Sequence, residues 1–112
     1  MSIEVTMRHS DVRIESLKEY AEKRMSVLKQ RFPKVSKAVV VIDVDAKKHM
    51  YIAEVVAHRN GEVVVGTKEF ALSGKSVIDS AAAHAERQLL RLRVKSWKET
   101  VRRQRANRHR HA

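Results

Sequence analysis

The sequence predicts a two-layer α+β domain in which a four-stranded mixed sheet carries two helices packed on one face. The length of 112 residues allows one ordinary domain. Strand-like alternation and helical apolar stripes follow one another in the order β-α-β-β-β-α, without a linker or an internal repeat. We therefore expect a single domain over residues 1–103, followed by a basic, disordered tail over residues 104–112.

Periodicity predicts the first strand, the first helix and the second strand. Apolar and polar residues alternate over residues 2–8, as in a half-buried strand. A helix capped by Ser10 or Asp11 then runs to Pro33, whose ring and missing N–H end it. Its core-facing stripe comprises Ile14, Leu17, Ala21, Met25, Leu28 and Phe32. β-branched residues over 35–45 predict the second strand, which the helical crossover makes parallel to the first if the two are neighbours.

Turn signals divide the rest of the chain into two strands and a long helix. Residues 45–48 suit a short turn, and strands are expected at about 49–58 and 62–72. Asn60-Gly61 joins these strands, because both residues tolerate the positive φ of a tight hairpin turn. Ser73 can cap the last helix, which no Pro or Gly interrupts between Gly74 and about Arg103.

Composition excludes several classes of protein. The chain has no cysteine, so it forms no disulfide, no thiolate metal site and no cysteine nucleophile. Its apolar runs are far shorter than the roughly 20 residues that span a bilayer. Its N-terminal segment resembles neither a signal peptide nor a transit peptide. We expect a cytoplasmic protein without a membrane partner.

Three partial motifs fall short of an active site. Gly74-Lys75-Ser76 resembles the end of a phosphate-binding P-loop, but Glu69 stands where that loop has its first glycine. The six histidines lack zinc-ligand spacing, and Asp43 and Asp45 have no base or metal ligand placed beside them. We expect a non-enzymatic protein with no catalytic residue, metal, cofactor or small-molecule substrate.

Positive charge is concentrated in the last quarter of the chain. The formal net charge is +11, and residues 86–112 carry ten basic and two acidic side chains, a net of +8. Residues 1–85 carry fourteen and eleven, a net of only +3. So polarised an excess indicates a polyanionic partner, nucleic acid above all. An anionic membrane and simple solubility are the competing interpretations.

The last helix separates an apolar face from a basic face. At about 100° per residue, its core side comprises Ile78, Ala81, Ala82, Ala85, Leu89 and Leu92. The far side carries basic side chains within an arc of about 80° that is about 25 Å long. We name this feature the basic ridge; it comprises Arg87, Arg91, Lys95, Lys98 and Arg102, together with His84. Because cations one turn apart repel each other, phosphate contacts explain the ridge better than a solvated helix face does.

Two further features extend the candidate RNA-binding surface. The first helix carries Lys23, Arg24 and Arg31 on one flank, which could join the basic ridge if the two helices pack side by side. Lys23 also has a purely structural interpretation, an ion pair with Glu19 one turn earlier. Trp97 lies among the ridge residues, where it either stacks on a base or covers the end of the core.

Two helical segments resemble one protein family. Ile78-Asp79, six further residues and Glu86-Arg87-Gln88-Leu89 keep the spacing of that family's Ala-Ile-Asp and Glu-Arg-Gln-Leu motifs. The segment Leu17-Lys-Glu-Tyr-Ala-Glu-Lys-Arg is similar to its Leu-Arg-Glu-Tyr-Val-Glu-Lys-Lys stretch. With strand order and length, these motifs make residues 1–98 resemble the short form of the ribosome hibernation-promoting factors, also called ribosome-associated inhibitor A or protein Y.

The resemblance implies a fold similar to a double-stranded-RNA-binding domain and a role in silencing idle ribosomes. Members bind the small ribosomal subunit at the decoding region, across the sites of messenger and transfer RNA, with a basic helical surface on ribosomal RNA. Arg87 matches the family's helix arginine. Four further residues fall where members are usually basic: Arg91, Lys95, Lys23 and Arg24. Arg31 and Lys98 depend on the charge argument alone.

The sequence departs from the family in two places. Ser73-Gly74-Lys75 stands where the family often has Asp-Met-Tyr, so the contact made by that tyrosine is absent. The chain also ends in a basic tail, whereas short members tend to end in neutral or acidic tails and long members continue into a dimerisation domain. We therefore expect no self-driven pairing of ribosomes, which would need a separate factor.

The sequence thus predicts a factor that occupies the decoding region and blocks initiation by steric occlusion, anchored by phosphate contacts. The alternative is a general double-stranded nucleic-acid-binding protein that uses the same basic ridge. A membrane-surface protein ranks last, because it needs apolar residues beside basic ones and only Val94 and Trp97 are expected near the ridge.

Overall fold

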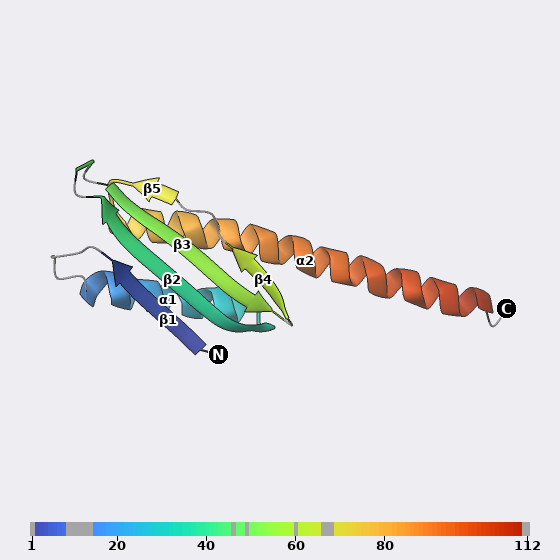
Figure 1. The fold of residues 1–112 in the computed structure, drawn as a ribbon. Coiled ribbons are helices and arrows are strands. Elements are labelled where there is room, and N and C mark those ends of the chain that lie inside the picture. The colour runs from blue at the N-terminus through green and yellow to red at the C-terminus, as the bar shows by residue number, and fades with distance from the viewer. Residues whose placement is uncertain are drawn as a thin grey trace.

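The computed structural model describes residues 2–8, 15–45, 47–48, 50–59, 61–65 and 69–110. Within these ranges the chain forms five strands and two helices (Figure 1). In chain order they are β1 (Ser2–Arg8), α1 (Glu15–Arg31), β2 (Val35–Asp45), β3 (Met50–Arg59), β4 (Glu62–Val65), β5 (Glu69–Ala71) and α2 (Gly74–Arg110). The expected order of elements is confirmed, except that the last strand is in two pieces. The expected caps Ser10 and Asp11 lie outside the described residues.

The sheet is mixed, as expected, with the strand order β1-β2-β3-β4. β1 pairs with β2 in parallel, and β3 pairs antiparallel with β2, β4 and β5. The single strand predicted over 62–72 is wrong in one respect. Four residue steps from Val65 to Glu69 face only three steps from Val56 to Ala53 on β3, so the register shifts by one between β4 and β5.

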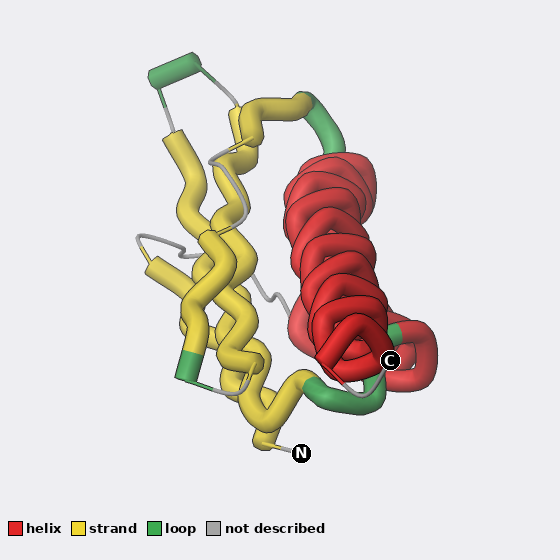
Figure 2. Tube along the Cα trace, turned by 90° about the vertical axis from the view of Figure 1, so that its right-hand side faces the viewer, coloured by secondary structure: helices red, strands yellow, loops and turns green. Residues whose placement is uncertain are grey.

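Both helices lie on the same face of the sheet, which gives the domain two layers (Figure 2). The strands turn alternate residues toward the helices; β3 buries Ala53, Val55 and Ala57 and ends its buried row with Arg59. The helix stripes expected to form the core are confirmed, except for Ile14, which lies outside the described residues. The buried stripe residues within the helices are Ala21, Met25, Leu28, Ile78, Ala81, Ala82, Ala85 and Leu89; Leu17 and Leu92 are half-buried, and Val77 is buried as well.

Local hydrogen bonds fix the connections between the elements. α1 ends just before Pro33, as expected, and Lys29 Nζ donates to the carbonyl oxygens of Pro33 and Val35 at 2.6 and 2.8 Å. Asp45 Oδ1 accepts two backbone N–H groups of the following turn at 3.1 and 3.2 Å. Gly61 has a φ of 79°, which confirms the positive φ expected for this half of the hairpin turn.

The start of α2 approaches α1 closely. Ser73 Oγ accepts the backbone N–H of Ser76 at 3.4 Å, which confirms Ser73 as the cap of α2. Gly74 is buried, and a Cβ atom placed on it would lie 2.7 Å from both Cδ atoms of Leu17. The glycine therefore permits close packing of the two helices, which accounts for it without a phosphate-binding loop.

α2 extends far beyond the sheet (Figure 1). It continues to Arg110, past the end that the sequence predicted near Arg103. The physical reason is that this stretch holds no Pro or Gly, and its Gln, Ala and Arg residues favour a helix. The separation of residues 104–112 from the domain as a basic tail stays a prediction. The radius of gyration is 17.7 Å, against about 13 Å for a compact domain of this length. Neither described helix has an apolar stretch of the length needed to cross a bilayer.

Candidate nucleic-acid interface

The basic ridge is a continuous surface feature of α2. Its five cations are exposed, and the structure pairs none of them with an acidic residue in the described part of the chain. The centre of the ridge lies about 120° around the helix from Ala85, which is buried. His84, at the N-terminal end of the ridge, is half-buried. Aligned cations without acidic partners create a positive potential that suits a row of phosphates.

Apolar surface borders the ridge more widely than the sequence suggested. Leu90 and Val94 are 50% and 44% exposed, and Leu90 was not expected there. They line a shallow groove of about 460 Å³ together with Glu99 and four ridge cations: Arg91, Lys95, Lys98 and Arg102. A molecule lying along the ridge therefore meets aliphatic carbon as well as positive charge.

The basic flank of α1 does not join the ridge. Glu86 of α2 binds two arginines of α1: its Oε1 lies 2.5 Å from Arg24 Nη1, and its Oε2 lies 2.9 Å from Arg31 Nη1. At about 100° per residue, Glu86 faces α1 about 140° away from the centre of the ridge. Arg24 has a side chain only 17% exposed and also lies 3.6 Å from Asp79, so it is part of the helix packing. Arg31 keeps 60% of its side chain exposed, and Lys23 is exposed.

A second polar contact ties the N-terminal end of α2 to α1. The Tyr20 hydroxyl donates to the carboxylate of Asp79, at 2.8 Å from Oδ1 and 2.7 Å from Oδ2. The pKa of Tyr20 is raised above its ordinary value of 10.0, mainly because of this hydrogen bond and secondly because of burial. Lys75 Nζ lies 5.5 Å from the centre of the Tyr20 ring, a cation–π contact at the position where the family often has a tyrosine.

These contacts assign roles that the sequence reasoning missed. Asp79 and Glu86 belong to the second-helix motif, and Tyr20 belongs to the first-helix motif, yet all three hold the helices together. The paired residues are 55 to 62 positions apart, so helical periodicity gave no sign of them. The one available signal was that two motifs of the same family contain complementary polar residues.

Trp97 is not part of the core. Its side chain is 66% exposed. The structure thus removes the interpretation that Trp97 is buried, and base stacking stays a prediction. Tyr51, expected in the core, is half-buried and packs against it, whereas the side chain of Phe70 lies outside the described residues.

Comparison with known proteins supports the resemblance seen in the two helices. Residues 3–96 match the family described as Sigma 54 modulation protein / S30EA ribosomal protein. A ribosomal subunit interface protein from Coxiella burnetii has the same fold, with a TM-score of 0.72 and 17% identity, over 84% of this chain and 99% of that one. The N-terminal domain of Thermus thermophilus Protein Y gives a TM-score of 0.67 and 25% identity, over 82% of this chain and 99% of that one. No curated protein sequence matches the chain.

The family match covers both helical motifs, the sheet except Ser2, and the ridge as far as Lys95. Lys98 and Arg102 lie beyond it, in the later part of α2. The chain therefore belongs to the Sigma 54 modulation protein / S30EA ribosomal protein family, and the predicted membership of the ribosome hibernation-promoting factors is confirmed.

Proposed function

We propose that this protein is a ribosome hibernation factor that binds the small ribosomal subunit at the decoding region. Family membership supports association with the ribosome. Two structural neighbours, a ribosomal subunit interface protein and the N-terminal domain of Protein Y, are consistent with this partner. A factor bound to ribosomes acts where they are, so the proposed location is the cytoplasm.

The observation that carries the proposal is the basic ridge. Five exposed cations along one line of α2 match a sugar–phosphate backbone better than a protein surface of mixed charge. The proposed phosphate contacts are Arg87, Arg91, Lys95, Lys98 and Arg102, with His84 at one end. On α1, exposed Lys23 and Arg31 are proposed as RNA contacts separate from the ridge, whereas Arg24 acts first through its ion pairs.

The proposed mechanism is steric and needs no catalysis. α2 has 37 residues and is therefore about 55 Å long, and its buried residues extend as far as Leu89. A rod of this kind, anchored by phosphate contacts, would fill space that messenger and transfer RNA require. Pairing of the silenced ribosomes would need a separate factor.

Co-sedimentation with purified small subunits at rising salt tests the proposal. The variant Arg87→Gln/Arg91→Gln removes two ridge charges, and Lys47→Gln/Lys48→Gln removes two exposed charges from the turn between β2 and β3. We expect the ridge variant to bind more weakly and to flatten the slope of log affinity against log salt by about 1.4 to 1.8. The turn variant should bind like the parent chain. Equal affinity of the two folded variants would contradict the proposal.

Competition distinguishes the ribosome from nucleic acid in general. Excess duplex RNA and duplex DNA are added to the same mixtures at one salt concentration. Binding near one to one that survives both competitors supports a specific site on the small subunit. If duplex RNA and duplex DNA displace the protein from the small subunit equally well, the result favours the alternative, a general double-stranded nucleic-acid-binding protein.

A further inference from the structure

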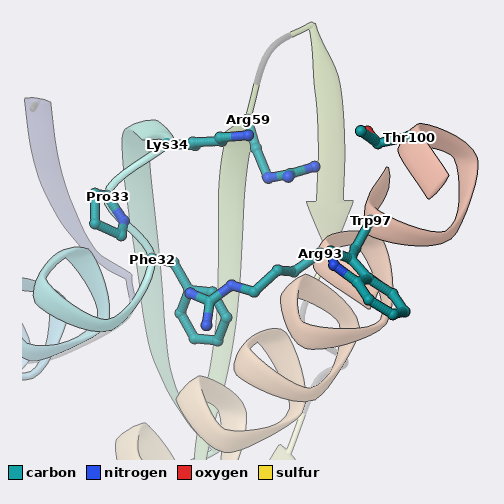
Figure 3. A pocket seen from close by; sticks show the side chains of 7 residues that line it. All are labelled: Phe32, Pro33, Lys34, Arg59, Arg93, Trp97 and Thr100. Atoms are coloured by element: carbon teal, nitrogen blue, oxygen red, sulfur yellow. The ribbon is translucent and has the colours of Figure 1, made fainter. Parts of the chain in front are cut away.

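A second groove lies where α2 leaves the sheet, on a different side of the helix from the ridge (Figure 3). Its volume is about 530 Å³, within the range of about 300–1,000 Å³ that small-molecule sites occupy. The lining residues are Phe32, Pro33, Lys34, Arg59, Arg93, Trp97 and Thr100. Three of them are basic and none is acidic, so the groove favours an anionic ligand.

Arg59 gives the strongest indication of a ligand. It ends the buried row of β3 after Ala53, Val55 and Ala57, and only 7% of it is exposed. The structure gives Arg59 no ion pair within the described ranges, and no fully buried side-chain nitrogen there lacks a hydrogen-bond partner, so the Arg59 guanidinium keeps contact with the solvent of the groove. Arg59 lines the groove, so an anion bound there would supply the missing charge.

The aromatic residues of the groove indicate a planar group on the same ligand. Phe32 is already covered, because the Arg93 guanidinium lies 4.5 Å from the centre of its ring. Trp97 extends from α2 on the other side of the groove from Lys34 and Arg59 (Figure 3) and is 66% exposed. An exposed indole beside cations is a platform for a nucleobase.

We propose that this groove binds a nucleotide, with the phosphate on Arg59 and Lys34 and the base stacked on Trp97. The source is either a free mononucleotide or an unpaired nucleotide of an RNA strand, which share this chemistry. The site does not depend on the proposed ribosome contact, because Trp97 lies about 120° around α2 from the centre of the ridge. Trp97 and Thr100 also lie outside the residues that match the family.

Trp97 is the single tryptophan of the chain, so its fluorescence reports on this groove alone. The experiment titrates the full chain with AMP and GMP, with a single-stranded RNA tetramer, and with inorganic phosphate. Saturable quenching by mononucleotides assigns a free nucleotide as ligand, and quenching by the tetramer alone assigns an RNA strand. Quenching by phosphate at the same concentrations, or by none of the probes, overturns the proposal.

Matched variants locate the binding. Arg59→Met should weaken binding at least tenfold, whereas Lys47→Met in the exposed turn between β2 and β3 should leave it unchanged. Lys34→Gln repeats the test at an exposed position that the core does not need, with an expected loss of several-fold. Circular dichroism checks that each variant is folded. Binding that Arg59→Met and Lys34→Gln leave intact in folded protein overturns the proposal.

Discussion

The hydroxyl of Tyr20 on α1 donates a hydrogen bond to Asp79 on α2, at 2.7 Å from Oδ2. The two residues are 59 positions apart in the chain and belong to the two motifs that this sequence shares with its family. This hydrogen bond joins the two helices near the start of α2, and the ion pairs of Glu86, two turns further along α2, join them again. Motif residues therefore align the helices, and the ridge next to them presents the charge.

Tyr20→Phe should destabilise the domain by about 1 kcal/mol, because the hydrogen bond ends on a half-exposed carboxylate. The effect should depend on pH. The folded protein raises the pKa of Tyr20 above 10.0, so the stabilisation is complete below pH 10.0 and is lost as the pH rises through the folded-state pKa. Urea unfolding of both proteins from neutral pH upward measures the difference. A difference that persists unchanged well above pH 10.0 would contradict this linkage.

Glu86→Gln should destabilise the domain by about 2 kcal/mol, because it leaves the largely buried Arg24 without its closest acidic partner. Arg31 loses its partner as well, but its exposed side chain contributes little. Glu99→Gln is the matched control, since it removes the same charge from an exposed position of α2. Chemical denaturation should show a change below about 0.5 kcal/mol for the control. Similar losses in both variants would exclude the Glu86 bridge as a significant source of stability.

The sequence predicted the parts of the fold that local patterns determine. Alternation located the strands, helical spacing identified Met25 and Ala85 as core residues, and the crossover made β1 and β2 parallel. The break between β4 and β5 was missed, because a one-residue shift against β3 leaves the pattern of β-branched residues almost unchanged. The end of α2 was missed because a projecting helix needs no apolar face, so its polar composition resembled that of a disordered tail.

In the candidate site, too, the sequence predicted what depends on one element and missed what depends on the packing of several. The ridge depends on one helix, so its geometry followed from the sequence at about 100° per residue. Arg24 and Arg31 were grouped by charge, but their partner Glu86 lies on another element and only the packing of the helices brings it to them. Arg59 was missed altogether, because an arginine at the end of a strand is ordinarily exposed and here it is buried under α2.

The projecting half of the ridge should contribute to binding, although it lies outside the family match. Arg102→Gln should lower the affinity for small subunits and reduce the salt slope by about 0.7 to 0.9. Arg103→Gln is the control, because it removes the same charge from the next residue, about 100° around the helix. Co-sedimentation at several salt concentrations measures both. Equal effects of the two substitutions would contradict the prediction, because they would mean that this part of α2 contributes only its net charge to binding and not a defined row of contacts.

Gly74→Ala tests the close approach of the two helices. The new Cβ would meet Leu17 at 2.7 Å, and Leu17 is a half-buried side chain that can shift, so we expect a cost of about 1 kcal/mol. In a Leu17→Ala background the obstacle is gone, and the same substitution should cost little. Urea unfolding of the four proteins of this cycle measures the coupling between the two positions.

Gly61→Ala is the matched control for that cycle. Its φ of 79° strains any L side chain, although no atom lies within 4 Å of a Cβ placed there. The cost, again about 1 kcal/mol, arises from the backbone and should be the same with and without Leu17→Ala. A Gly74→Ala cost that Leu17→Ala leaves unchanged would show that Gly74, too, is required by its backbone and not by the approach of α1.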